Sequence, residues 1–212
     1  MQAICVVKGR LIRLKVNEFS DLQLDIIKEL TNIGGGNAAT SISHLINKPV
    51  NMMVPTIEIL NYNEVYEKIT PEDQMVNAVI MRMIGGGEGT FLFIIDEEAS
   101  TDIISMMVPE GIEITEELST SGIKELVNIV VTSYLNAVSK MIDISFISSI
   151  PLLTKDMFGA ILSNVYIESE QYDDNVLIIK NEFIYAGDKI ESSLYFIPKP
   201  GVLTKLFNKL GF

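Results

Sequence analysis

The sequence has little of the chemistry on which most redox and metal sites depend. A single cysteine, Cys5, excludes an intramolecular disulfide and any cysteine-rich metal site. A single histidine, His44, argues against a Ser-His-Asp hydrolase and against a zinc enzyme. No run approaches the roughly 18 consecutive apolar residues of a membrane-spanning helix, so we expect no membrane insertion. The apolar run 3–7 is too short for a signal peptide, and we expect a cytoplasmic location.

Basic residues are also scarce. The 212 residues include 16 Lys and Arg against 28 Asp and Glu, which gives a formal net charge of −12. Such a chain lacks the basic surface that nucleic acids require, so nucleic acid is not an expected partner. Apolar residues make up 48% of the sequence and charged residues 21%, a mix typical of a globular protein.

An internal repeat organises the chain. The stretch DIIKELTN, which begins at Asp25, returns 96 residues later as SGIKELVN, which begins at Ser121. In both copies a proline follows the asparagine after 22 intervening residues, at Pro55 and Pro151. Chance does not account for two copies that keep both the local spacing and the distant proline. We therefore predict half repeats at about 19–110 and 115–212 within a single domain, 19–212, preceded by an N-terminal extension, 1–18.

The hydrophobic pattern predicts the elements of each half. Apolar residues at three- and four-residue steps indicate long amphipathic helices over 21–47 and about 115–142. Strands are expected at 50–59, 75–84, 90–95, 144–153, 175–185 and 190–197, with short helices at 96–107 and after Pro200. This order predicts an α+β fold, internally duplicated about a pseudo-two-fold axis. Its mostly antiparallel sheet is covered by the two long helices.

The repeat places a polar stripe on each long helix. Positions i, i+4 and i+7 share one helix face. That face holds Asp25, Glu29 and Asn32 in the first copy, and Ser121, Glu125 and Asn128 in the second. A solvated surface would explain one such stripe. It does not require the same acid and the same amide to recur in halves that have otherwise diverged, so the repetition favours a functional role in at least one copy.

A glutamate and an asparagine suit chemistry that depends on positioning. A free Glu is a poor general base at neutral pH, but its carboxylate can bind a cation on a partner protein. Asn offers a donor and an acceptor on one rigid group, and it can orient a water molecule without titrating. Positioning of this kind suffices in phosphoryl transfer, where little deprotonation of the nucleophile is needed early. The metal that neutralises charge could sit in the partner.

These residues carry a family resemblance. The two copies of [Asp/Ser]-x-x-x-Glu-x-x-Asn-x22-Pro resemble the doubled signature of the CheC phosphatases of chemotaxis, within the CheC/CheX/FliY superfamily. The phrase LTNIGGGNAAT at 30–40 resembles the first helix of that family, and the resemblance covers about 19–212. It implies a hydrolase that acts on the aspartyl phosphate of the response regulator CheY. By the same resemblance, Glu29 and Glu125 would anchor a lysine of CheY, while Asn32 and Asn128 would orient the attacking water.

The resemblance also implies partners and alternatives. No cofactor is expected in this chain, because the Mg²⁺ of that reaction belongs to CheY. The deamidase CheD is an expected second partner that raises phosphatase activity, and we expect a monomer or a heterodimer with CheD. Asp25 and Ser121 are expected to cap or support the motifs. The alternatives are a CheC-like adaptor that binds CheY or CheD without turnover, and a component of the flagellar switch.

The two copies differ just after the motif. The first helix continues as Gly34-Gly35-Gly36, whereas the second continues as Val130-Val131-Thr132. Three glycines inside a helix cost about 2–3 kcal/mol relative to alanine, so they are expected to permit close packing against the sheet or the other helix. The alternative is that they leave room for the backbone of a partner. A further glycine-rich segment, 85–89, is expected to form a hairpin turn.

Overall fold

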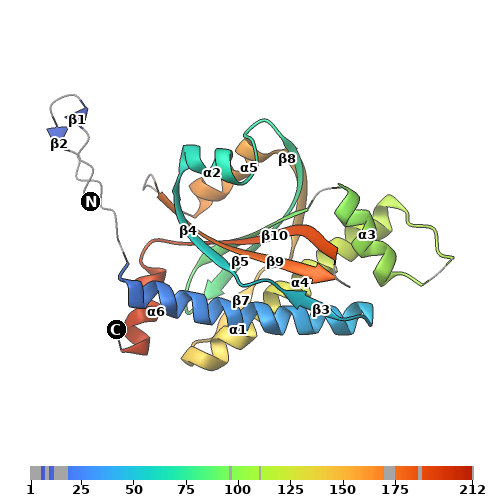
Figure 1. Ribbon diagram of the computed structural model, residues 1–212, viewed down its shortest axis with the longest axis horizontal. Helices are drawn as coiled ribbons and strands as arrows, with labels where there is room; N and C mark the ends of the chain where they lie inside the picture. The colour runs from blue at the N-terminus through green and yellow to red at the C-terminus, as the bar shows by residue number, and fades with distance from the viewer. Residues whose placement is uncertain are drawn as a thin grey trace.

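The computed structural model describes residues 6–7, 10–11, 19–95, 97–109, 111–169, 175–185 and 188–211 (Figure 1). Within the predicted N-terminal extension, two short strands are described, β1 (Val6–Val7) and β2 (Arg10–Leu11), which pair antiparallel. The rest of that extension lies outside the described residues.

The order of elements is the same in both halves of the chain. The first half contains α1 (Asp21–Ile46), β3 (Val50–Met52), β4 (Thr56–Asn61), α2 (Tyr62–Lys68), β5 (Met75–Gly85), β6 (Gly89–Ile95) and α3 (Glu97–Met107). The second half contains α4 (Glu116–Ile142), β7 (Phe146–Ser148), β8 (Leu152–Met157), α5 (Phe158–Glu168), β9 (Asn175–Tyr185), β10 (Asp188–Pro198) and α6 (Val202–Leu210).

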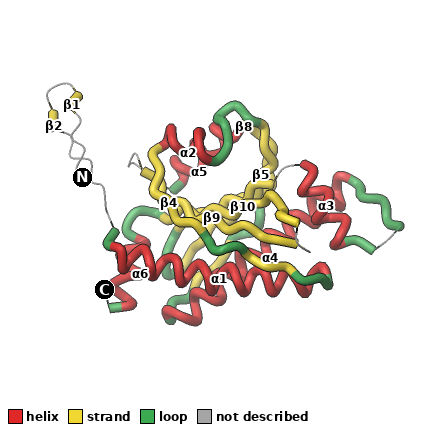
Figure 2. The backbone as a smooth tube through the Cα atoms, viewed as in Figure 1, coloured by secondary structure: helices red, strands yellow, loops and turns green. Residues whose placement is uncertain are grey.

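The main sheet confirms the predicted pseudo-two-fold. Its strand order is β3-β9-β10-β6-β5-β7, with β4 also paired to β9 and β8 also paired to β5. Figure 2 shows the strands of this sheet in yellow, with α2 and α5 on one side and α1 on the other. Exchanging each strand for its counterpart in the other half returns the same order reversed. The pair β6–β10 lies at the centre, where Phe91 is opposite Phe196 and Phe93 is opposite Leu194. Every pairing described is antiparallel, as the sequence predicts.

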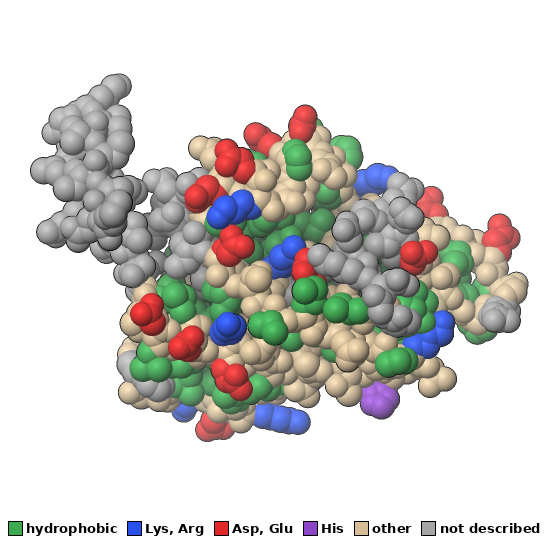
Figure 3. Space-filling view, viewed as in Figure 1, with side chains coloured by type: hydrophobic (Ala, Val, Ile, Leu, Met, Phe, Trp, Pro, Cys, Tyr) green, Lys and Arg blue, Asp and Glu red, His purple; other side chains and the backbone are tan. Residues whose placement is uncertain are grey.

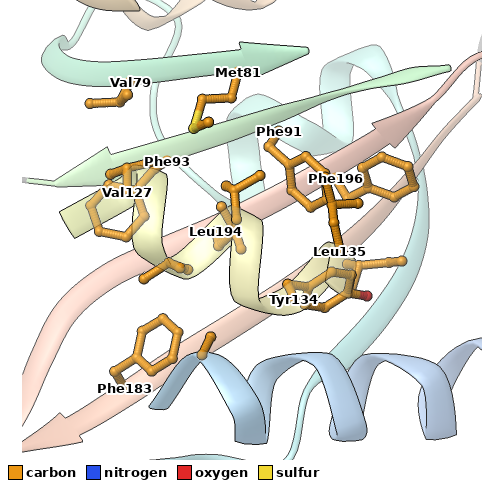
Figure 4. Close-up of a cluster of buried hydrophobic side chains, with 14 of the residues drawn as sticks. Val79, Met81, Phe91, Phe93, Val127, Tyr134, Leu135, Phe183, Leu194 and Phe196 are labelled. Carbon is orange, nitrogen blue, oxygen red and sulfur yellow. The ribbon is translucent and has the colours of Figure 1, made fainter. Parts of the chain in front are cut away.

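The two long helices, α1 and α4, cover one face of this sheet. Aromatic and aliphatic side chains from β6, β9 and β10 point toward α4, with α1 alongside (Figure 4). Phe91, Phe93, Val127 and Leu194 are each at most 1% exposed. Burial of apolar area on this scale, at about 25 cal/mol per Å², is the main force that holds both helices against the sheet.

The opposite face of the sheet carries two helices that the sequence analysis missed. A second buried cluster joins α2 and α5 to that face through residues such as Val65, Leu92 and Phe158. Each predicted strand before these helices, 50–59 and 144–153, is divided in two in the structure, with Pro55 directly before β4 and Pro151 directly before β8. Proline lacks the N–H that a continuous strand would need at these positions.

Matching signals begin and end the two long helices. Ser20 and Thr115 are the N-caps, and their hydroxyls accept hydrogen bonds from the backbone N–H groups three residues later. Asn47 and Asp143, which lie 96 positions apart, end α1 and α4 in the left-handed conformation at φ 52°. The motif residues therefore occupy equivalent places on two helices of nearly equal length.

Candidate functional site

The inner faces of α1 and α4 correspond residue by residue. Every buried residue of α1 has a buried counterpart 96 positions later in α4. These residues of α1 are Ile27, Leu30, Thr31, Gly34, Gly35, Ala38, Ala39, Ile42 and Ile46. The repeat found in the sequence therefore fixes how each helix is rotated about its own axis, and both motif stripes point away from the sheet.

Each stripe forms a polar surface on the outside of its helix. The side chains of Glu29 and Glu125 are exposed, and those of Asn32 and Asn128 are partly exposed. Within the described ranges, none of these four side chains forms a hydrogen bond or an ion pair with the rest of the chain. All four are therefore available to a partner.

Asp25 and Ser121 open the two stripes, one helical turn before each glutamate, and both are exposed. In the described part of the chain neither one caps a helix, because Ser20 and Thr115 are the N-caps. The capping role that the sequence suggested for them is therefore wrong.

The structure brings each stripe together but keeps the two stripes apart. The helices α1 and α4 cross with their N-termini at opposite ends of the molecule (Figure 1). Near the crossing, the hydroxyl oxygens of Ser41 and Ser133 lie 2.8 Å apart. Because both motifs precede the crossing on antiparallel helices, they flank it on opposite sides. The arrangement is that of two separate sites on one outer surface.

A buried hydrogen-bonded link fixes the turn of α1 that carries Asn32. The Tyr134 hydroxyl of α4 donates to Thr31 Oγ1 at 3.2 Å, and Thr31 Oγ1 in turn donates to the carbonyl of Ile27 at 2.7 Å. Burial raises the pKa of Tyr134 to about 12, against an opposing effect of its hydrogen bond with Thr31. The hydroxyl therefore remains a neutral donor at physiological pH, next to the backbone of Asn32.

The glycines after Asn32 have different surroundings. A Cβ at Gly34 would lie 2.5 Å from the ring of Tyr134, so this glycine permits the close crossing of the two helices. The predicted tight packing against the other helix is thus confirmed at Gly34. At Gly36 a Cβ would meet nothing within 4 Å, and the residue is exposed. Packing inside the described chain therefore does not explain Gly36.

The second site lacks this buried link. The counterparts of Thr31 and Tyr134 are Val127 and Ala38, which have no side-chain hydroxyl. Sequence reasoning missed the Thr31–Tyr134 pair because the two residues are 103 positions apart. The comparison of the two halves carries a signal for it, since Thr31 and Tyr134 are polar where their counterparts are apolar.

The outer surface that carries α1 is acidic. Carboxylates gather over the N-terminal part of this helix in the space-filling view (Figure 3), in keeping with the net charge of −12. Within the described residues, no group of three or more His, Cys, Asp or Glu is arranged to hold a metal ion. None of the described helices is both long enough and apolar enough to cross a membrane.

Fold and site together define an internally duplicated α+β protein with two helix-borne Glu-x-x-Asn sites. The model of the CheC-like family matches residues 22–59, the segment that contains the first motif. Over 202 residues the chain is 27% identical to the CheY-P phosphatase CheC of Bacillus subtilis, and the match covers 92% of this chain and 97% of that protein. The resemblance to CheC that the sequence indicates is confirmed, and the chain is CheC-like in sequence and in fold.

Two further matches agree with this resemblance. The flagellar motor switch phosphatase FliY of Bacillus subtilis is 26% identical over 139 residues, which cover 62% of this chain and 36% of that protein. The crystal structure of Thermotoga maritima FliY superposes with a TM-score of 0.73 at 20% identity, covering 92% of this chain and 98% of the other. At that identity the structural match supports the fold alone.

Proposed function

We propose that this chain hydrolyses the aspartyl phosphate of a CheY-type response regulator at two sites, one on α1 and one on α4. The observation that carries the proposal is the doubled Glu-x-x-Asn motif, which occupies the outer face of both helices with all four side chains free of partners among the described residues. Similarity along nearly the whole chain to a protein named as a CheY-P phosphatase supports the same reaction.

The asparagines, Asn32 and Asn128, would orient water. An aspartyl phosphate is a mixed anhydride with a good leaving group, so its hydrolysis needs an in-line water more than it needs a strong base. A carboxamide can hold that water through its donor or its acceptor, and it does not titrate. Because both asparagines are only partly exposed, their side chains are more restrained than a fully exposed side chain, which lowers the entropic cost of the aligned geometry.

The glutamates, Glu29 and Glu125, would anchor the partner. Each lies one turn before its asparagine, and each is exposed and pairs with no cation among the described residues. A charge-assisted hydrogen bond to a lysine of the regulator would fix the distance between the acyl phosphate and the asparagine. The Mg²⁺ that neutralises the phosphate would be held by the regulator. Asp25 and Ser121 differ chemically, so we assign them to docking, where either a carboxylate or a hydroxyl can contribute.

The test is phosphate release from acyl-phosphorylated CheY in the presence of Mg²⁺. The variants are Glu29→Ala/Asn32→Ala, Glu125→Ala/Asn128→Ala and the combination of all four substitutions. Lys28→Ala and Lys124→Ala are matched controls, because these residues directly precede the glutamates but lie off the stripes. We expect wild type and both controls to accelerate phosphate release, each pair variant to retain part of this activity, and the fourfold variant to lose it while still unfolding cooperatively. The assay is run with and without CheD, which we propose as a partner that increases the rate.

Two outcomes would contradict the proposal. If the wild type binds phosphorylated CheY but gives no acceleration with or without CheD, the chain is an adaptor. If the fourfold variant loses its fold, the stripes are structural.

A further inference from the structure

The helix α1 contains a glycine, Gly36, for which packing within the described chain gives no reason. Glycine in a helix interior is less favourable than alanine by about 1 kcal/mol. Gly34 is required by the ring of Tyr134, but a Cβ at Gly36 would meet no atom within 4 Å among the described residues outside its own stretch of helix. Gly36 also lies in the middle of a 26-residue helix, far from either cap, so it does not serve to end the helix.

Gly36 extends the stripe of the first site. Asp25, Glu29, Asn32 and Gly36 follow one another at steps of four, three and four residues, so they lie in one row on the outer face of α1. Gly36 is exposed and stands one turn beyond the asparagine, on the side away from the glutamate. A partner that binds Glu29 and Asn32 and continues along the same row of α1 therefore passes over Gly36.

We propose that Gly36 is a specificity-determining position of the first site, where the bare helix backbone lets the phosphorylated partner protein approach Asn32 closely. The partner is the same acyl-phosphorylated receiver protein, so this inference rests on the proposed function. In the second site the equivalent position is Thr132, whose β-branched side chain stands one turn beyond Asn128. The two sites therefore differ in how closely the partner can approach, although their Glu and Asn are identical.

The inference makes stability and activity change in opposite directions at Gly36. With open space around the Cβ, Gly36→Ala should raise Tm by about 2–4 °C, because alanine favours the helix. In a protein whose second site is removed by Glu125→Ala/Asn128→Ala, Gly36→Thr should raise KM for phosphorylated CheY about tenfold, equivalent to ~1.4 kcal/mol, with little change in kcat. Gly36→Ala should act in the same direction to a smaller extent. Thr132→Gly, in a protein with the first site removed, should lower both KM and Tm.

The controls separate this inference from the proposed function. Binding of CheY activated with beryllofluoride, a mimic of the acyl phosphate, is measured for the same variants, so that docking is observed even without turnover. The Gly36 substitutions should leave KM of the second site unchanged when the first site is removed by Glu29→Ala/Asn32→Ala. If Gly36→Thr has wild-type KM and wild-type affinity in the first-site protein, the inference is wrong even when turnover is normal. If turnover is absent from wild type but Gly36→Thr weakens docking, the proposed function fails and the docking position stands.

Discussion

Gly34→Ala should destabilise this protein, although alanine is the better helix former. The change gains about 1 kcal/mol of helix propensity. It also places a methyl group 2.5 Å from the ring of Tyr134, which is buried and packed edge-to-face on Phe91 with ring centroids 5.7 Å apart. Overpacking of this kind costs about 1–3 kcal/mol. A cavity of about 50 Å³ bordered by Thr31 and Tyr134 lets the ring give way slightly, which places the cost near the middle of that range.

The expected net loss for Gly34→Ala is therefore about 1 kcal/mol in the free energy of unfolding. Gly36→Ala, two residues away in open space, is the matched control and should gain about 1 kcal/mol. Urea unfolding of both variants measures the difference of about 2 kcal/mol directly. In a Tyr134→Ala background the ring is gone, so Gly34→Ala should become stabilising there. A Gly34→Ala protein as stable as wild type would refute the account of a crossing held close by this glycine and this ring.

The remaining predictions concern the core beneath the site. Tyr134→Phe should lower the free energy of unfolding by about 1 kcal/mol, because it removes the hydrogen bond to Thr31 while Thr31 keeps its bond to Ile27. Chemical denaturation at pH 7 measures this loss. Ala38→Ser, at the apolar counterpart of Tyr134, should give no comparable gain. The raised pKa of Tyr134 means that the native state retains a proton which the unfolded chain releases near pH 10. The stability that the protonated Tyr134 hydroxyl contributes is therefore complete below pH 10 and is lost as pH rises through about 12. Over this interval the unfolding free energy of Tyr134→Phe should fall less steeply than that of wild type. Parallel curves would contradict the raised pKa of Tyr134. Phe93→Ala should cost about 3–5 kcal/mol, whereas Ile150→Ala, at a side chain 87% exposed, should change Tm hardly at all.

The sequence predicted the two long helices and the main strands well, because the duplication shows the pattern of each of these elements twice. The bounds of α1 and α4 were predicted to within one residue from the three- and four-residue spacing of their apolar side chains. The same helical spacing predicted that the residues of each motif stripe share one face of their helix. Helical periodicity specifies which residues share a face, and the repeat identified which of those residues recur.

The two missed helices gave only a weak helical pattern. In α5 the buried residues Phe158, Ile161, Leu162 and Val165 keep helical spacing, but the exposed face also holds the apolar Ile167, so the contrast between the two faces is weak. The helix α2 has only 7 residues, which is too few for a period of 3.6 to be read. The strands before these helices were predicted as continuous, because the apolar residues on both sides outweighed the single proline in each.

Contacts between residues far apart in the sequence limited how much of the candidate site could be predicted. The link from Tyr134 to Thr31 and the clash that a side chain at Gly34 would make both join α1 to α4 across about one hundred residues. From the sequence, the three glycines offered two explanations, internal packing and room for a partner. The structure assigns the first to Gly34, while the second remains our proposal for Gly36.

The strand order of the sheet also limits which strand pairings can form while the chain is being synthesised. The strands β3 and β4 pair with β9, and β6 pairs with β10, so three of the four strands in the first half have a partner that begins at residue 175 or later. During synthesis the first half therefore leaves the ribosome with unpaired strand edges, which are prone to aggregation until β9 and β10 emerge. Before then the hairpin of β5 and β6, the pairing of β7 and β8 with β5, and the local helices can form, and the fold closes last at its own centre.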